Sequence, residues 1–190
     1  MINDGEYRYR PATMDDLAFV REAFADRPDR GLHDFSDSGI DAMLAQDIES
    51  RLPEVFPITA ESSWRGMNIF ERMPNEPISV GRFIVDGTLM HSVVQQMHPD
   101  HRGAGLWGAK LTPLAMAMVF LVYQADVFQW QITKTITPMF EWSKHGTTIG
   151  DIAPEHTEAG SEQVLGQETR QQWHDRVGNT AYNYHVEQGG

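Results

Sequence analysis

The sequence predicts an α/β (α+β) domain in which a central, mostly antiparallel mixed sheet is flanked by helices. Three observations predict this class. Apolar and polar residues alternate through 67–73, 78–85 and 89–97, which is the period of half-buried strands. A glycine-rich loop at 99–108 follows the last of these strands and runs into a long apolar helix. A further strand and helix come next, and this order gives a layered architecture.

The chain reads as a single domain spanning residues 1–190. Its 190 residues fall within the ordinary size of one domain, and 41% hydrophobic with 22% charged residues is typical of a globular protein. No repeat or linker divides it. Residues 153–179 are acidic and then helical in pattern, so we expect them to form an insertion before the last strand.

The charge balance favours some partners over others. Fifteen Lys and Arg against 27 Asp and Glu give a net charge of −12. Such a surface repels nucleic acid and anionic membranes and attracts cationic partners such as amines, although solubility alone also explains it. The longest apolar stretch, 114–123, is shorter than the roughly 20 residues of a membrane span.

The absence of cysteine excludes disulfides, thiolate metal sites and a cysteine nucleophile. It also fits a reducing compartment. The first residues lack the basic start and apolar stretch of a signal peptide. We therefore expect a cytoplasmic protein.

Proline and helix-capping residues mark where the first strands and helices begin and end. Residues 7–10 alternate as a short strand, which Pro11 interrupts. Thr13 can cap the helix that follows, with Asp15 and Asp16 in its first turn. A second helix begins at 36–38 and ends before Pro53. The predicted later elements are a hairpin turn at 74–77, a turn at 86–87, a strand at 127–134, a helix at 138–145 ended by Gly146, a strand at 147–152, a helix at 168–177 and a closing strand at 180–186.

The segment that carries chemistry runs from Pro99 to Gly108. Its glycines let the backbone turn with its N–H groups converging, and the first turn of the helix adds unpaired N–H groups. Together they form an anion cradle suited to a pyrophosphate. No Gly-Lys-Ser/Thr closes the motif, and the preceding strands form an antiparallel meander. These facts exclude a Walker loop and a dinucleotide-binding βαβ unit.

This segment resembles the acetyl-CoA signature of the Gcn5-related N-acetyltransferase (GNAT) superfamily, (Gln/Arg)-x-x-Gly-x-(Gly/Ala). Arg102 and Gly105 occupy its first two fixed places, while Trp107 replaces the last small residue and could narrow the site. The resemblance covers most of 7–150 and implies acetyl-CoA as co-substrate. The implied cofactor-binding residues are Val93, Gln95, Met97, Arg102, Gly103, Ala104, Gly105, Leu106 and Trp107.

The catalytic groups that the family often uses are incompletely matched. No carboxylate base stands on the strand 89–97, which leaves His91 or Glu71, the latter expected on an exposed edge of the hairpin. The position of the thiolate-protonating tyrosine, four residues before Gly146, holds Trp142, and Tyr123 is the nearest substitute. Thr135 stands where many members carry asparagine.

A metal site is not predicted. His98, His101 and His145 could form one with Asp100, but histidines beside a phosphate loop are better explained by anion contacts or exposure to solvent.

Two function hypotheses remain open. In the first, an acetyl-CoA-dependent N-acetyltransferase modifies a small-molecule or protein amine, which enters over the two amino-terminal helices and the loop 52–65. In the second, a catalytically degenerate GNAT-like domain serves as a structural or interaction protein. Some bacteriophages encode GNAT-like proteins of this size, which would make the chain virion-associated. A homo-oligomer or a larger protein assembly is compatible with both.

Overall fold

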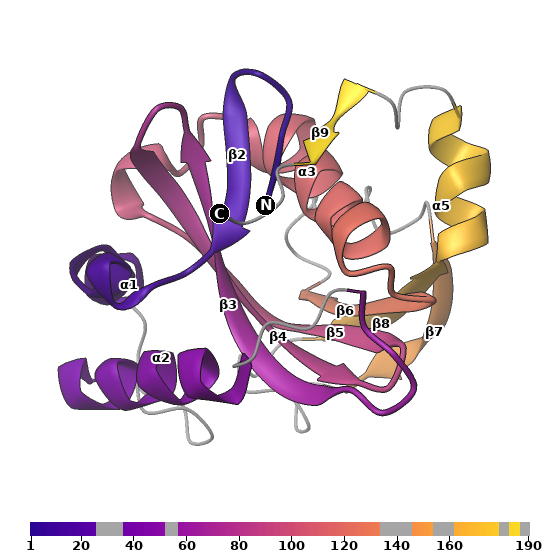
Figure 1. The fold of residues 1–190 in the computed structure, drawn as a ribbon, viewed down its shortest axis with the longest axis horizontal. Helices are drawn as coiled ribbons and strands as arrows, with labels where there is room; N and C mark the ends of the chain where they lie inside the picture. The colour runs from indigo at the N-terminus through magenta and orange to yellow at the C-terminus, as the bar shows by residue number, and fades with distance from the viewer. Residues whose placement is uncertain (26–35, 52–56, 134–145, 154–161, 179–182, 187–190) are drawn as a thin grey trace.

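The computed structural model describes residues 1–25, 36–51, 57–133, 146–153, 162–178 and 183–186. They form a nine-stranded sheet in the order β7-β8-β6-β5-β4-β3-β2-β1-β9. All neighbouring strands in this part of the chain are antiparallel except β5 and β6, which are parallel. The predicted fold class, a mostly antiparallel mixed sheet flanked by helices, is therefore confirmed (Figure 1).

The strands include every one that the sequence predicts within the described residues. Their bounds are β1 (Ile2–Asn3), β2 (Tyr7–Pro11), β3 (Ser63–Arg72), β4 (Glu76–Asp86), β5 (Leu89–Met97), β6 (Val127–Thr133), β7 (Thr147–Ile152), β8 (Gln163–Thr169) and β9 (His185–Val186). The predicted turns at 74–77 and 86–87 connect β3 to β4 and β4 to β5, so β3, β4 and β5 form an antiparallel meander.

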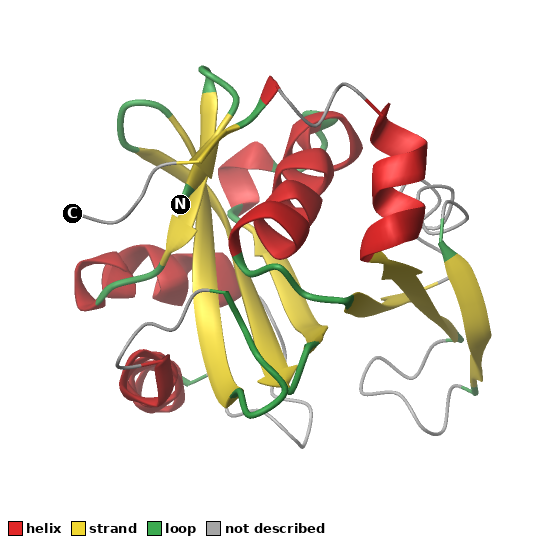
Figure 2. Ribbon diagram, turned by 45° about the vertical axis from the view of Figure 1, so that its right-hand side comes forward, coloured by secondary structure: helices red, strands yellow, loops and turns green. Residues whose placement is uncertain are grey.

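Helices cover both faces of the sheet. On one face a short 3₁₀ turn (Met14–Asp16) leads into α1 (Leu17–Phe24), beside which lies α2 (Asp37–Arg51). On the other face a continuous helical segment follows the glycine-rich loop (Figures 1 and 2). Its parts are a π turn (Trp107–Leu111), α3 (Thr112–Ala117) and a second π turn (Met118–Val122), and α5 (Arg170–Val177) packs beside it.

Each face has its own hydrophobic core. The larger core lies between the sheet and α3, and the aromatic rings of Phe120 and Trp173 join α5 to it at 5.4 Å. The smaller core lies under α1 and α2. A buried ion pair adds to this smaller contact, because Arg82 of β4 donates two hydrogen bonds to Asp47 of α2, at 2.8 and 3.0 Å. The position of α2 on the sheet is thus fixed by charge as well as by packing.

The carboxyl-terminal third differs from the sequence prediction. Within 153–179, which we expect to be an insertion, the structure places β8, a strand of the central sheet between β6 and β7. Its buried positions include Val164, Gly166 and Glu168, and the carboxylate of Glu168 accepts two hydrogen bonds from Arg176 at 2.8 Å. A strand whose buried face carries a glycine and a glutamate shows no apolar alternation, so the pattern missed it.

Other predictions have mixed outcomes. The helix predicted at 168–177 is confirmed as α5. The closing strand is seen only as β9, which pairs with β1, because 179–182 lie outside the described residues. The helix predicted at 138–145, with Trp142 and His145, also lies outside them, as does Thr135. In the described part of the chain, the helices are too short or too polar to span a bilayer.

Candidate functional site

Strands β5 and β6 separate in the middle of the sheet. They pair at three positions only, the last being His91 opposite Gln129. Beyond this point β6 stays paired with β8 up to Thr133, whereas β5 stays paired with β4 up to Met97. In the part of the chain that the structure describes, the edge of β5 that faces β6 therefore has no partner strand from residue 92 to residue 97. This fork exposes backbone N–H and C=O groups that a ligand can pair with.

A β-bulge lies at the start of the fork. Arg82 of β4 is opposite Val94, and the next residue, Phe83, is opposite Ser92. Val93 is therefore the extra residue of the bulge and has no partner across the β4–β5 ladder. Because a bulge bends its strand and redirects neighbouring groups, β5 changes direction where it leaves β6.

The glycine-rich loop, which the sequence predicts to be an anion cradle, lies at the far end of this edge. Gly103 and Gly105 have φ angles of +79° and +69°, values that favour glycine. A Cβ atom at either position would meet no atom within 4 Å. Residues 102–105 are exposed, and Trp107 opens the helix directly after them. Left-handed residues beside the free N–H groups of a helix start form a concavity that binds anions.

The loop is connected to β5 by its own arginine. Arg102 Nε donates to the carbonyl oxygen of Met97 at 3.1 Å, while the residue as a whole is exposed. The cradle and the free edge of β5 are thus held together, and a positive charge lies beside both. Such a charge complements a phosphate ligand.

Trp107 and Leu106 are both half-buried and pack against the core on the α3 side. The Nε1 atom of Trp107 is buried and has no hydrogen-bond partner. The indole ring, expected in the loop itself, is therefore directed partly into the core, and the exposed surface of the cradle is formed by residues 102–105.

The histidines near the loop make contacts within the protein. His98 stacks on Phe19 of α1 at 5.6 Å and lies 3.2 Å from a carboxylate oxygen of Glu22. His101 lies 3.9 Å from a carboxylate oxygen of Glu76. Among the described residues there is no group of three or more His, Asp and Glu side chains that could hold a metal ion.

Glu71 does not lie on an exposed edge, which corrects our expectation. The residue is 1% exposed, and its carboxylate accepts hydrogen bonds from Arg8 Nε at 2.7 Å and Arg10 Nε at 2.9 Å. Arg10 also binds Asp16, and although burial alone would raise the pKa of Asp16, this hydrogen bond contributes to lowering it below the ordinary value. Both oxygens of the Glu71 carboxylate are thus engaged by guanidinium groups inside the protein, which weakens Glu71 as a candidate base.

His91 lies where the fork begins. It is half-buried, and burial lowers the pKa of its imidazole, an effect that a hydrogen bond with the side chain of Gln129 partly offsets. A neutral imidazole is able to accept a proton. Of the candidate bases, His91 lies nearest in the strand to the bulge at Val93.

Tyr123 lies at the carboxyl end of the helix that follows the cradle. It is fully buried, and its hydroxyl donates to Asn68 Oδ1 at 3.1 Å. Its ring lies 5.7 Å from that of Trp64 and 5.4 Å from that of Phe83. The amide nitrogen of Asn68 is buried without a partner. The phenol is therefore part of a polar contact inside the larger core.

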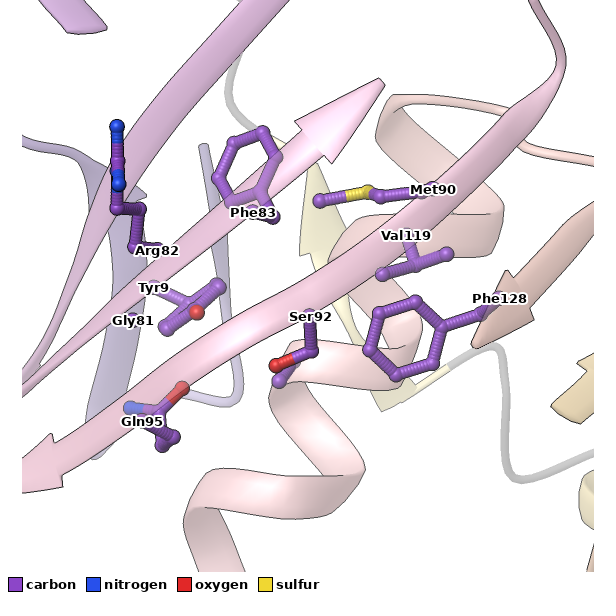
Figure 3. Close-up of a pocket in the computed structure, with 10 residues that line it drawn as sticks. Tyr9, Gly81, Arg82, Phe83, Met90, Ser92, Gln95, Val119 and Phe128 are labelled. Atoms are coloured by element: carbon purple, nitrogen blue, oxygen red, sulfur yellow. The ribbon is translucent and has the colours of Figure 1, made fainter. Parts of the chain in front are cut away.

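A small cavity lies behind β5, between the sheet and α3 (Figure 3). Sequence reasoning did not identify it, because its walls come from β2, β4, β5, β6 and α3. No local pattern predicts such a grouping, which depends on strand register. The lining residues are Tyr9, Gly81, Arg82, Phe83, Met90, Ser92, Gln95, Ala115, Val119 and Phe128.

No protein-family model and no curated protein sequence matches the chain. Solved structures do match. A mutant form of the spermidine N-acetyltransferase SpeG from Vibrio cholerae aligns with a TM-score of 0.70 at 11% identity, over 91% of this chain and 99% of that chain. The same protein in complex with CoA and spermine gives 0.69 at 11% identity, over 89% and 98%. Its dodecameric form gives 0.68 at 12% identity, over 90% and 98%.

These similarities establish the fold. The chain has the GNAT-like fold that the signature implied, and the resemblance extends over nine-tenths of its length. The neighbours are N-acetyltransferases from Vibrio cholerae. They give no support to a bacteriophage origin or to a place in a virus particle.

Proposed function

We propose that this protein is an acetyl-CoA-dependent N-acetyltransferase that acts on a cationic amine. The observation that carries the proposal is the fork between β5 and β6, whose free edge runs from the bulge at Val93 to the anion cradle at Gly103–Gly105. A ligand with a pyrophosphate at one end, an amide-containing arm and a reactive group at the other end matches the cradle, the free edge and the bulge, respectively.

The residues present fit acetyl-CoA. Its pyrophosphate would accept hydrogen bonds from the N–H groups of Gly103, Ala104, Gly105, Leu106 and Trp107, beside the guanidinium of Arg102. The open space over both positive-φ glycines, which a Cβ would fill, is the room that such a ligand needs. The backbone of Val93, Gln95 and Met97 would pair with the amides of the pantetheine arm, as an added strand pairs with a sheet edge.

Acetyl-CoA supplies a thioester, whose acyl carbon an amine can attack. The amine must first lose a proton, and the imidazole of His91 at the start of the fork would accept it. The amine nitrogen then forms the amide bond while the carbon–sulfur bond breaks, and the departing sulfur takes a proton. A backbone N–H freed by the bulge would stabilise the negative charge on the carbonyl oxygen. Tyr123 is the proposed donor of the proton to sulfur, for which its buried hydroxyl would have to leave the hydrogen bond to Asn68.

The acceptor would be a small polyamine or a related amine. The chain carries a net charge of −12, which attracts polycations and raises their local concentration. The neighbours named as spermidine N-acetyltransferases, one of them bound to spermine, support the same class. A homo-oligomer is also part of the proposal, because one neighbour is dodecameric. Light scattering on the purified protein would measure this.

A thiol-release assay tests the proposal. The chain contains no cysteine, so a thiol-reactive dye reports only the CoA that the reaction sets free. We expect acetyl-CoA with spermidine or spermine to release CoA at a rate above that of acetyl-CoA alone. Mass spectrometry should find the acetylated amine. Release without an acetylated product, or no binding of acetyl-CoA at millimolar concentration by folded protein, would contradict the proposal.

A further inference from the structure

The cavity behind β5 is small. Its volume is about 30 Å³, which is enough for a small group, since a cavity of about 10–15 Å³ already holds one water molecule. One end is lined by apolar side chains of β5, β6 and the second π turn, namely Met90, Phe128 and Val119. Figure 3 shows Ser92 midway along β5, with Met90 on one side of it and Gln95 on the other.

The cavity lies beside the start of the fork. Ser92 lines it and directly precedes Val93, the bulged residue at which β5 leaves β6. Phe128, also a lining residue, belongs to one of the three pairs that join β5 to β6. Given the proposed function, the thioester lies at this end of the free edge. The acyl group of the thioester then lies next to this apolar cavity.

The other end of the cavity is closed by a polar side chain in a fixed position. Gln95 Nε2 donates to Ser79 Oγ at 2.6 Å, and Ser79 Oγ itself donates to the carbonyl oxygen of Gln96 at 3.0 Å. The side chain of Gln95 thus lies across Gly81, its partner on β4. It fits because Gly81 has no side chain, since a Cβ there would overlap Gln95 Oε1 and lie 2.7 Å from the Tyr9 hydroxyl oxygen.

We infer that Gln95 limits the acyl donor to acetyl-CoA by occupying the space into which a longer acyl chain would extend. The inference rests on the proposed function and names its donor class. Removing the side chain beyond Cβ would open the region over Gly81, between Ser79 and Tyr9, and create room for additional methylene groups. Gln95 is then a specificity-determining residue that acts through its shape.

Isothermal titration of the full chain with CoA, acetyl-CoA and butyryl-CoA tests this inference without knowledge of the acceptor. We expect the unmodified protein to bind butyryl-CoA at least about tenfold more weakly than acetyl-CoA, since one misfitting methylene changes discrimination by about 10–200-fold. In Gln95→Ala the two affinities should come within about threefold of each other, because the end wall is gone.

Gln96→Ala is the matched control. It removes the same side chain from the next residue of β5, which points to the opposite face of the sheet because side chains alternate along a strand. It should keep the preference for acetyl-CoA. If Gln95→Ala fails to fold, Ser79→Ala releases the anchor of Gln95 instead, and we expect the preference to fall by several-fold.

The outcomes separate this inference from the function on which it rests. Equal binding of acetyl-CoA and butyryl-CoA by the unmodified protein overturns the inference and leaves the proposed function standing. The same holds if Gln95→Ala and Ser79→Ala, shown to be folded, keep the original preference. Absence of binding by all three ligands overturns both.

Discussion

Replacing Gly105 by alanine should separate the ligand-binding role of the cradle from its role in the fold. Gly105 has a φ of +69°, and a Cβ atom there would meet no atom within 4 Å. The structural cost is therefore backbone strain without steric overlap, about 1–2 kcal/mol for an L-residue in the left-handed region. For a chain of this size, each kcal/mol lowers the melting temperature by about 2–4 °C.

The loss of free energy of ligand binding should be larger than the loss of folding stability. The added methyl group would occupy the space over the converging N–H groups and displace a phosphate from them. A hydrogen bond to a charged group contributes about 1.5–3 kcal/mol. Loss of one such bond would weaken CoA binding by about tenfold to 100-fold, since 1.4 kcal/mol corresponds to a factor of ten.

Gly5→Ala provides the control for this experiment. Gly5 also has a positive φ, +93°, and open space around its Cβ position, but it lies in the turn between β1 and β2. Both variants should lose similar stability in thermal unfolding, whereas only Gly105→Ala should lose affinity for CoA in calorimetry. Equal affinities in the two variants would refute the assignment of the cradle.

Three further changes test the fold and the proposed chemistry. Burial lowers the pKa of His91 below its unfolded value of about 6.5. This group therefore contributes stability above pH 6.5, and that stability is lost as the pH falls through the folded pKa. The variant His91→Gln should flatten the pH dependence of stability and, if His91 is the base, lower kcat. Asp47→Asn leaves the buried guanidinium of Arg82 unpaired and should cost about 3–5 kcal/mol in urea unfolding. Tyr123→Phe removes the hydrogen bond to Asn68 and should cost about 1–3 kcal/mol.

Each of these three predictions has a result that would contradict it. A stability curve of His91→Gln that keeps its slope below about pH 6.5 would show that another group titrates there. For Asp47→Asn the control is Asp41→Asn, whose partner Arg21 is exposed, and its loss of stability should be much smaller. Equal losses would contradict the role of burial. Tyr123→Phe with unchanged kcat would leave Tyr123 a purely structural residue.

The sequence predicted those parts of the fold whose causes are local. The turns at 74–77 and 86–87 and the alternation of the strands beside them gave the meander of β3, β4 and β5. The loop at 99–108 was identifiable because a left-handed backbone needs glycine, and Gly103 and Gly105 have this conformation. Strand β8 was missed because its buried Glu168 is neutralised by Arg176, a partner from the next helix.

The candidate site was predictable to the same extent. The proposed anion cradle depends on consecutive residues, so the motif alone was enough to predict its place. The environment of Glu71 was not predictable, since a hairpin carboxylate is usually exposed and only the pairing of β2 with β3 brings Arg8 and Arg10 against it. The polar end of the cavity behind β5 likewise depends on the register that sets Gln95 opposite Gly81.

The sequence by itself thus determined the fold class, the meander of β3, β4 and β5 and the position of the glycine-rich loop, because these follow from hydrophobic periodicity and from the backbone conformations open to glycine. Only the tertiary structure decided where β5 leaves β6, which charges are buried together and which side chains enclose the cavity. These features arise from contacts between residues far apart in the chain, where strand register and the energetic cost of an unpaired buried charge select the arrangement.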